Sequence, residues 1–386
     1  MKNILLASVV FILSVSLVFA RGEPPAPHVM NPDLINVHNQ CIVQLSDDIE
    51  SDNVRGIANA LAKRAGATNK FVYENSIKGF TINLPCQAAK RAFGASAWVA
   101  RMEPDSVVSI SKGKPNRGGD DTSSEPSPLP ETEDWGVGRV GGPMSEEGLT
   151  AWVIDTGVDL NHPDLNVKED KGKPWGFSVF YNRGKMDMDD QNGHGTHVAG
   201  TIAAIKNNIG SIGVAPGATI VPVRVLDRQG SGTISGVIAG VDFVAENVLP
   251  GDCVNMSLGG GVSTALDNAV IGAANAKTET YFVLAAGNSG ANAENHSPAR
   301  VEGDFENIFT IAAIAEDNAT TTNIDETDMM PWWSNYGKDV EYAAPHACAV
   351  LMLKGSDVTY DSFAVEPEDH KIKDVDYPII HTGEGL

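Results

Sequence analysis

Short, almost uninterrupted apolar runs recur through the second half of this chain and constrain its fold more than any other feature. They cover residues 151–154, 219–225, 253–258, 281–285 and 308–314. Runs this short and this apolar are typical of strands buried on both faces of a parallel sheet. Between them, residues 233–247 and 263–276 carry apolar side chains at helical spacing. The alternation predicts an α/β fold, with a mostly parallel sheet and helices on both of its faces.

Three polar side chains stand where such elements end or begin. Asp155 and Asn288 each follow an apolar run and lie in a glycine turn. His194 stands between two glycines, directly before an apolar stretch that predicts a buried helix over residues 196–205. Groups at the carboxyl ends of parallel strands line a ligand crevice, and a histidine there can transfer protons near neutral pH. We therefore predict one site containing all three; a histidine that only caps its helix is the alternative.

The three segments that hold these residues, taken in this order, resemble the subtilisin-like serine peptidases (subtilases). The resemblance implies that Asp155 accepts a hydrogen bond from Nδ1 of His194. It implies further that His194 acts as general base and then general acid, and that Asn288 stabilises the oxyanion. It also implies a subtilisin-like fold. The strand with which the family pairs substrate through main-chain hydrogen bonds corresponds to Ser257, Leu258 and Gly259.

The nucleophile that the family requires is missing from this sequence. The family motif Gly-Thr-Ser-Met-Ala precedes Ala-Pro-His, whereas here Ala343-Ala344-Pro345 runs directly into His346, and Gly-Thr-Ser occurs nowhere. Ser334, Ser356 and Ser362 lie outside any such context, and we interpret them as ordinary surface or turn serines. Two functions remain. One is a serine endopeptidase that is inactive as written because of an internal deletion at 345; the other is a non-catalytic pseudoprotease that binds peptides or a protein partner.

The resemblance also implies a structural calcium ion. Residues 161–165 and 205–216 match the segments that bind calcium in many subtilases, and calcium takes six to eight oxygen ligands. The implied ligands are the side chains of Asp164 and Asn207 and the carbonyl groups of Ile205, Ile209 and Ser211. A further ligand is expected from the start of the mature chain.

Residues 41–111 alternate strand and helix signals in the order βαββαβ, which predicts a small ferredoxin-like α+β domain. In subtilases a domain of this kind is the propeptide, which assists folding and inhibits the enzyme. An unrelated small domain is the alternative.

Four cysteines allow three disulfide connectivities. Because one pair falls early and the other late, Cys41–Cys86 is the expected bridge, and Cys253 and Cys348 are expected to be buried free thiols.

The first residues of the chain predict secretion. Lys2 precedes an apolar run that ends at Ala20, which is typical of a secretory signal peptide. The formal net charge of −22 argues against nucleic acid or an anionic membrane as partner. We expect an extracellular monomer that acts on peptide or protein substrates, binds its own propeptide, and has no membrane contact after signal cleavage. The predicted divisions are signal peptide 1–20, propeptide 21–112, linker 113–134, peptidase domain 135–354 and acidic tail 355–386.

Overall fold

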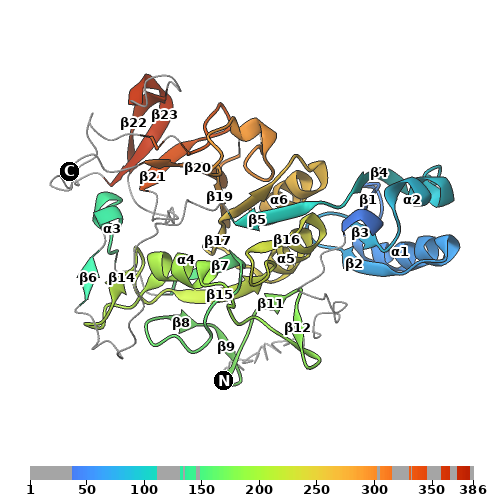
Figure 1. The fold of residues 1–386 in the computed structure, drawn as a ribbon, viewed down its shortest axis with the longest axis horizontal. Coiled ribbons are helices and arrows are strands. Elements are labelled where there is room, and N and C mark those ends of the chain that lie inside the picture. Colours follow the sequence, from blue (N-terminus) through green and yellow to red (C-terminus); the bar gives the residue numbers. More distant parts are fainter. Residues whose placement is uncertain are drawn as a thin grey trace, which may run out of the picture.

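The computed structural model describes residues 37–110, 131–133, 135–144, 148–301, 305–314, 330–331, 333–345, 358–365 and 372–382 (Figure 1). The predicted signal peptide and most of the predicted linker lie outside these ranges. Among the described residues, no helix is both long enough and apolar enough to cross a membrane.

The N-terminal unit has the predicted βαββαβ order. Its elements are β1 (Cys41–Leu45), α1 (Ser51–Ala65), β2 (Asn69–Tyr73), β3 (Gly79–Ile82), α2 (Cys86–Phe93) and β4 (Val99–Pro104). The four strands form an antiparallel sheet in the order β2-β3-β1-β4, against which both helices pack around a common core. The disulfide Cys41–Cys86 joins β1 to α2, as predicted.

The second unit is built on a sheet whose strands are parallel over its main part, which confirms the predicted fold class. Its strands are β7 (Thr150–Asp155), β11 (Phe177–Ser178), β15 (Thr219–Arg224), β17 (Cys253–Met256), β19 (Tyr281–Ala285), β20 (Ile308–Ile314) and β21 (Tyr342–Pro345). They lie in the order β11-β15-β7-β17-β19-β20-β21. The carboxyl ends of β7, β17 and β19, which carry or precede the predicted site residues, are therefore neighbours.

Helices cover both faces of this sheet because successive side chains of each strand point to opposite faces. Ala151 and Val153 of β7 pack with α4 (His194–Ala203). Trp152 and Ile154 pack on the other side, in a core formed with α5 (Ile234–Asn247) and α6 (Thr264–Ala276). Both faces of β7 are thus buried, as its apolar run predicts.

The helix boundaries differ slightly from the predicted ones, for local reasons. The hydroxyl of Thr233 accepts a hydrogen bond from the backbone N–H of Gly236, and that of Ser263 accepts one from Leu266. Both residues are N-caps and stand just outside their helices. The helix predicted over residues 196–205 begins two residues earlier, at His194, and ends at Ala203.

The predicted strand over residues 253–258 divides into two elements. Its first part is β17, whereas Leu258 begins β18 (Leu258–Gly260), which leaves the central sheet. There β18 joins a three-stranded antiparallel sheet with β5 (Val107–Ile110) and β16 (Ser231–Thr233). Figure 1 shows β5 running from the N-terminal unit into the α/β unit.

The C-terminal region adds further strands to the central sheet. The predicted acidic tail contains two strands, β22 (Val358–Val365) and β23 (Ile372–Thr382), which form an antiparallel pair that continues the sheet beyond β21. An edge strand offers unpaired backbone N–H and C=O groups to further strands, and here β23 pairs in parallel with β21. Cys348 and Ser356 lie outside the described residues.

The remaining elements are short. They are η1 (Val37–Asn39), β6 (Thr132–Glu133), α3 (Trp135–Arg139), β8 (Asn166–Val167), β9 (Glu169–Asp170), β10 (Lys173–Pro174), β12 (Tyr181–Asn182), β13 (Lys185–Met186), β14 (Ser211–Ile212) and η2 (Ala293–Asn295). One of them alters the predicted linker, because β6 pairs in parallel with β14. The last described residues of that linker are therefore part of the α/β unit.

Candidate active site

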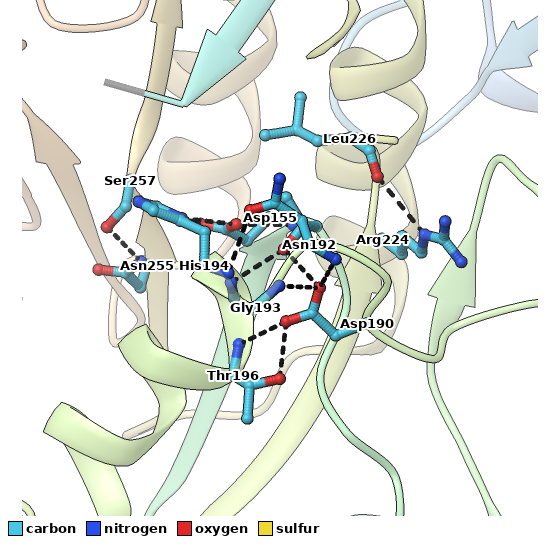
Figure 2. Close-up of polar contacts among 12 residues, drawn as sticks. Asp155, Asp190, Asn192, Gly193, His194, Thr196, Arg224, Leu226, Asn255 and Ser257 are labelled. Atoms are coloured by element: carbon cyan, nitrogen blue, oxygen red, sulfur yellow. Dashed lines mark hydrogen bonds and ion pairs between the residues drawn. The ribbon is translucent and has the colours of Figure 1, made fainter. Parts of the chain in front are cut away.

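Asp155 and His194 form a hydrogen-bonded pair at the end of β7 and the start of α4. Nδ1 of His194 lies 2.8 Å from Oδ1 and 2.9 Å from Oδ2 of Asp155 (Figure 2). The Asp155 side chain is fully buried, and the His194 side chain is 27% exposed. Because the aspartate occupies Nδ1, the Nε2 atom of the imidazole is left for a reacting group. The predicted base and its orienting carboxylate are thus brought together.

The environment of the imidazole favours its protonated form. Burial alone would lower the pKa of His194, but the hydrogen bond with Asp155 and the negative charges of Asp155 and Asp190 together raise it above its usual value. A histidine whose pKa is raised by a carboxylate partner can hold the proton that it removes from a substrate or nucleophile. The arrangement therefore suits a general base that later returns its proton.

Asn288 lies in the turn that follows β19, two strands from β7. The turn is held by Asn335, whose fully buried side chain sequence analysis missed. Oδ1 of Asn335 accepts hydrogen bonds from the backbone N–H groups of Ser289 and Ala291, and its Nδ2 donates to the carbonyl of Ala286. A single amide thus fixes the backbone on both sides of Asn288. The only sequence signal is the Asn-Tyr-Gly turn at 335–337.

Ser334, the residue before this amide, is a buried turn serine and not a surface one. Its hydroxyl accepts a hydrogen bond from the backbone N–H of Ala313 and donates to the carbonyl of Asn335. Its hydrogen bonds therefore give it a structural role in this turn. Ser362 lies in β22.

The predicted substrate strand is already paired with another segment of this chain. Leu258, Gly259 and Gly260 lie opposite Ile110, Ser109 and Val108 of β5 in antiparallel register. On its other edge β5 pairs with β16. Ser257, just before β18, accepts a hydrogen bond through its hydroxyl from Nδ2 of Asn255 at 2.9 Å (Figure 2). The edge that would take an extended peptide therefore holds one in this structure.

Buried carboxylates join the N-terminal unit to the helices of the α/β unit. Asp242 of α5 accepts hydrogen bonds from the backbone N–H groups of residues 74–76, at 2.8 to 3.2 Å. In the opposite direction, Asp105 accepts from the backbone N–H and hydroxyl of Ser235 at the start of α5. Glu103 does the same at the start of α6, through Ser263 and Ala265. Carboxylates at helix N-termini are stabilising, so Asp105 and Glu103 favour this docking.

The residues of the predicted calcium site lie close together, since Asp164 contacts the segment that leads from Ile205 to β14. Asp164 Oδ1 accepts hydrogen bonds from the backbone N–H of Ile205 and from Nδ2 of Asn207, at 3.1 and 2.9 Å. Ile209 and Ser211 follow in the same loop, beside β6. Sequence analysis missed Glu131, which stands just before β6 and accepts the backbone N–H groups of Asn207 and Asn208.

The donor set of this loop is of the kind that calcium prefers, since it offers carboxylate, amide and carbonyl oxygens. Burial raises the pKa of Asp164, and the charge of Glu131 adds to that effect. In the described conformation the nitrogen of Asn207, and not its oxygen, faces Asp164. No group of three or more His, Cys, Asp or Glu side chains among the described residues is arranged to hold a metal. A cavity of about 630 Å³, lined in part by Asp164 and Ser211, lies beside the loop.

Known proteins resemble this chain over most of its length. The sequence profile described as "Subtilase family" matches residues 147–368. Alkaline serine exoprotease A of Vibrio alginolyticus is 37% identical over 71% of this chain and 46% of its own length. The extracellular serine proteinase of Thermus sp. (strain Rt41A) is 38% identical over 72% of this chain and 60% of its own length. Subtilisin-like protease 2 of Pseudogymnoascus destructans is 34% identical over 84% of this chain and 73% of its own length.

The chain therefore spans about half to three-fifths of the length of the first two of these relatives, and nearly three-quarters of the third. The profile match covers more than half of the chain and includes Asp155, His194 and Asn288. These matches agree with the parallel sheet and with the buried aspartate–histidine pair at its edge. On this evidence the chain belongs to the subtilase family.

Proposed function

We propose that this chain is a secreted subtilase that binds extended peptides along β18 and carries the family's machinery for peptide-bond hydrolysis without its serine. The observation that carries the proposal is the pairing of β5 with β18 beside the Asp155–His194 pair. A strand edge that accepts one peptide of the chain itself has the shape and hydrogen-bonding groups to accept another.

In the proposed reaction, Nε2 of His194 would take a proton from a nucleophile, and Asp155 would stabilise the imidazolium through Nδ1. Asn288 would donate a hydrogen bond to the oxyanion that forms on the substrate carbonyl. No serine in a family-type nucleophile motif is present. Members of such a unit act together, so loss of the nucleophile alone removes nearly all of the rate. We therefore expect the chain as written not to hydrolyse peptides at a subtilase rate.

A fluorophosphonate probe, which labels activated serines, tests this. We expect no labelling of the expressed chain. Insertion of a hairpin followed by Gly-Thr-Ser-Met-Ala-Ala-Pro between Pro345 and His346 should restore labelling and peptidase activity, and His194→Ala should abolish both. Labelling of a serine in the unmodified chain, together with peptidase activity that depends on His194, would overturn the expected inactivity.

The second candidate is a non-catalytic pseudoprotease that binds peptides or a protein partner, and it is favoured by a peptide-binding edge that is present although the serine is missing. A peptide corresponding to residues 105–110 should compete with β5 for β18 in the full chain. The same peptide should bind directly to a chain from which residues up to the end of β5 have been removed. Val107 to Ile110 supplies alternating exposed and buried side chains, so a peptide with Asp replacing Val108 and Ile110 is the matched control. Equal binding of both peptides would exclude recognition along β18.

We propose that the N-terminal unit is the propeptide. Its support is the occupation of β18 by β5 and the clamp of Asp242, Asp105 and Glu103 on α5 and α6. Cleavage would fall after β5, so mass spectrometry of secreted protein should find a chain that begins between Lys112 and Trp135. A chain that begins at Arg21 would show that no processing occurs, as expected if maturation requires the missing serine of the same molecule.

We propose that calcium binds at Asp164, Asn207 and the carbonyl groups of Ile205, Ile209 and Ser211, with Glu131 as the ligand from the start of the mature chain. The support is the convergence of these oxygen donors on one loop. A ligand bound only by the folded state raises stability with its concentration. Calcium should therefore raise the melting temperature, and Asp164→Asn should remove the effect. Asp170→Asn, at an exposed position, is the control, and an unchanged melting temperature in excess chelator would exclude the site.

A further inference from the structure

Asp190 stands four residues before His194, and both oxygens of its carboxylate accept several hydrogen bonds. Oδ1 accepts from the hydroxyl of Thr156 and from the backbone N–H groups of Asn192 and Gly193, at 2.9 to 3.0 Å. Oδ2 accepts from the backbone N–H and the hydroxyl of Thr196, at 3.0 and 2.7 Å. One carboxylate thus binds the strand that carries Asp155 to the turn and helix that carry His194 (Figure 2).

Thr156 completes the connection. Its hydroxyl donates to Asp190 and accepts from the backbone N–H of Gly195, at 2.9 Å in both cases. Its own backbone N–H donates to Oδ1 of Asp155. The residues on both sides of His194 are therefore fixed, Gly193 by Asp190 and Gly195 by Thr156. The approach is close, because a Cβ atom at Gly195 would overlap the carbonyl oxygen of Gly157.

The carboxylate also replaces a missing helix cap. Gly193, at the N-cap position of α4, has no side chain that could accept from the first turn. Asp190 accepts the N–H of Thr196 from outside the helix and places a negative charge at its N-terminus, where such a charge is stabilising. Its backbone is held in turn, since the N–H of Asp190 donates to the carbonyl of Val158.

We infer that Asp190 is a positioning residue that, through Thr156 and the first turn of α4, holds the imidazole of His194 with Nδ1 against Asp155. The inference rests on the proposed function only in taking Asp155 and His194 as the reacting pair. Among the described residues the carboxylate of Asp190 makes no hydrogen bond to the imidazole, and it acts through the backbone of residues 193–196.

The charge of Asp190 supports the same role. Burial alone would raise the pKa of Asp190, but the hydrogen bonds from Gly193, Thr196 and Asn192 hold it below its usual range. The carboxylate is therefore ionised wherever His194 titrates. The charged groups that act on the imidazole are Asp155 from β7 and Asp190 from the loop before α4.

The test reads His194 directly, in the full chain, by NMR of selectively ¹⁵N-labelled histidine, with His194→Gln assigning the resonances among the nine histidines. Asp190→Asn should lower the pKa of His194 and cause loss of the downfield Nδ1 proton signal of the Asp155 hydrogen bond. Thr156→Val, which keeps both carboxylates, should also cause loss of that signal. A merely structural role would lower the melting temperature and leave the His194 resonances unchanged.

Asp189→Asn is the matched control. Asp189 is adjacent and exposed. Its carboxylate accepts a long hydrogen bond, at 3.3 Å, from the backbone N–H of Leu160, and its carbonyl contact with Arg224 is unaffected by the substitution, so the His194 signals should stay as they are. If Asp190→Asn does not fold, Thr156→Val decides. His194 signals that match the parent in whichever of the two variants folds would overturn the inference. The NMR readout needs no nucleophile, so its outcome is independent of fluorophosphonate labelling. Either experiment can support its own proposal while the other contradicts its own.

Discussion

His194 combines a half-buried position with a fully buried carboxylate partner, and this combination makes its protonation part of folding. We predict that His194 adds to the free energy of unfolding in acid and that the contribution disappears as the pH rises. The pKa of His194 is raised in the folded protein, so protonation favours folding. The contribution is fully present below about pH 6.5, the usual pKa of an unfolded histidine, and is lost as the pH rises through the folded-state pKa.

Urea unfolding of the parent and of His194→Gln, at about pH 5.5 and about pH 9, measures this difference, since the two values bracket the ordinary titration of histidine. The parent should be more stable relative to the variant at the lower pH. His197→Gln, on the exposed side of the same helix, is the control. A gap between parent and His194→Gln that is the same at both pH values would contradict the prediction.

At the scale of elements, α6 carries a glycine that only the docked N-terminal unit explains. A Cβ atom at Gly272 would overlap the carbonyl oxygen of Ser76, in the turn that Asp242 holds. Gly272→Ala should therefore weaken the binding of the N-terminal unit. In the α/β unit alone the same change should stabilise α6 by about 1 kcal/mol, because alanine is the better helix former. The two effects have opposite signs, which separates docking from helix stability.

Binding of a separately expressed segment 37–110 to the rest of the chain measures the first effect, and thermal unfolding of that remainder measures the second. Gly56→Ala is the matched control, since Gly56 lies exposed in α1 with no atom near the position of a Cβ. It should stabilise the N-terminal segment without changing its affinity. Unaltered affinity in Gly272→Ala would mean that this face of α6 does not carry the docked unit.

At the scale of the whole molecule, the two units have separate cores and different covalent support. The Cys41–Cys86 disulfide closes a 45-residue separation within the N-terminal unit. Constraint of the unfolded chain by a loop of this size corresponds to about 4 kcal/mol. We predict that the double substitution Cys41→Ser and Cys86→Ser lowers the free energy of unfolding of the N-terminal unit by a large part of that amount. The unfolding of the α/β unit should stay almost unchanged.

Calorimetry of the full chain with and without the cysteine substitutions, compared with the isolated α/β unit, which contains neither cysteine, tests this. Cys253 provides an internal control, because it is a buried free thiol and burial raises its pKa. It should resist thiol reagents until the α/β unit unfolds. Thiol reaction of Cys253 at the same temperature at which the N-terminal unit melts would show that the two units unfold together.

The sequence by itself determined the main strands and helices and indicated the candidate site residues. Apolar runs of strand length predicted β7, β15, β19 and β20, because a strand buried on both faces cannot carry polar side chains in its interior. Glycine turns after those runs placed Asp155 and Asn288 at one edge of the sheet. The positions of the four cysteines predicted the Cys41–Cys86 bridge. Each of these signals is contained in a few consecutive residues or in a simple count.

Only the tertiary structure decided which distant groups support the site. Asp190 reaches Thr156 across 34 residues, Asn335 reaches Ala286 across 49, and Glu131 reaches Asn207 across 76. The pairing of β5 with β18 and the addition of the tail strands to β21 are likewise long-range. A side chain that accepts a hydrogen bond from a remote backbone leaves no periodic pattern in the sequence. Its partner is set by how the strands and helices pack, and packing depends on the whole chain at once.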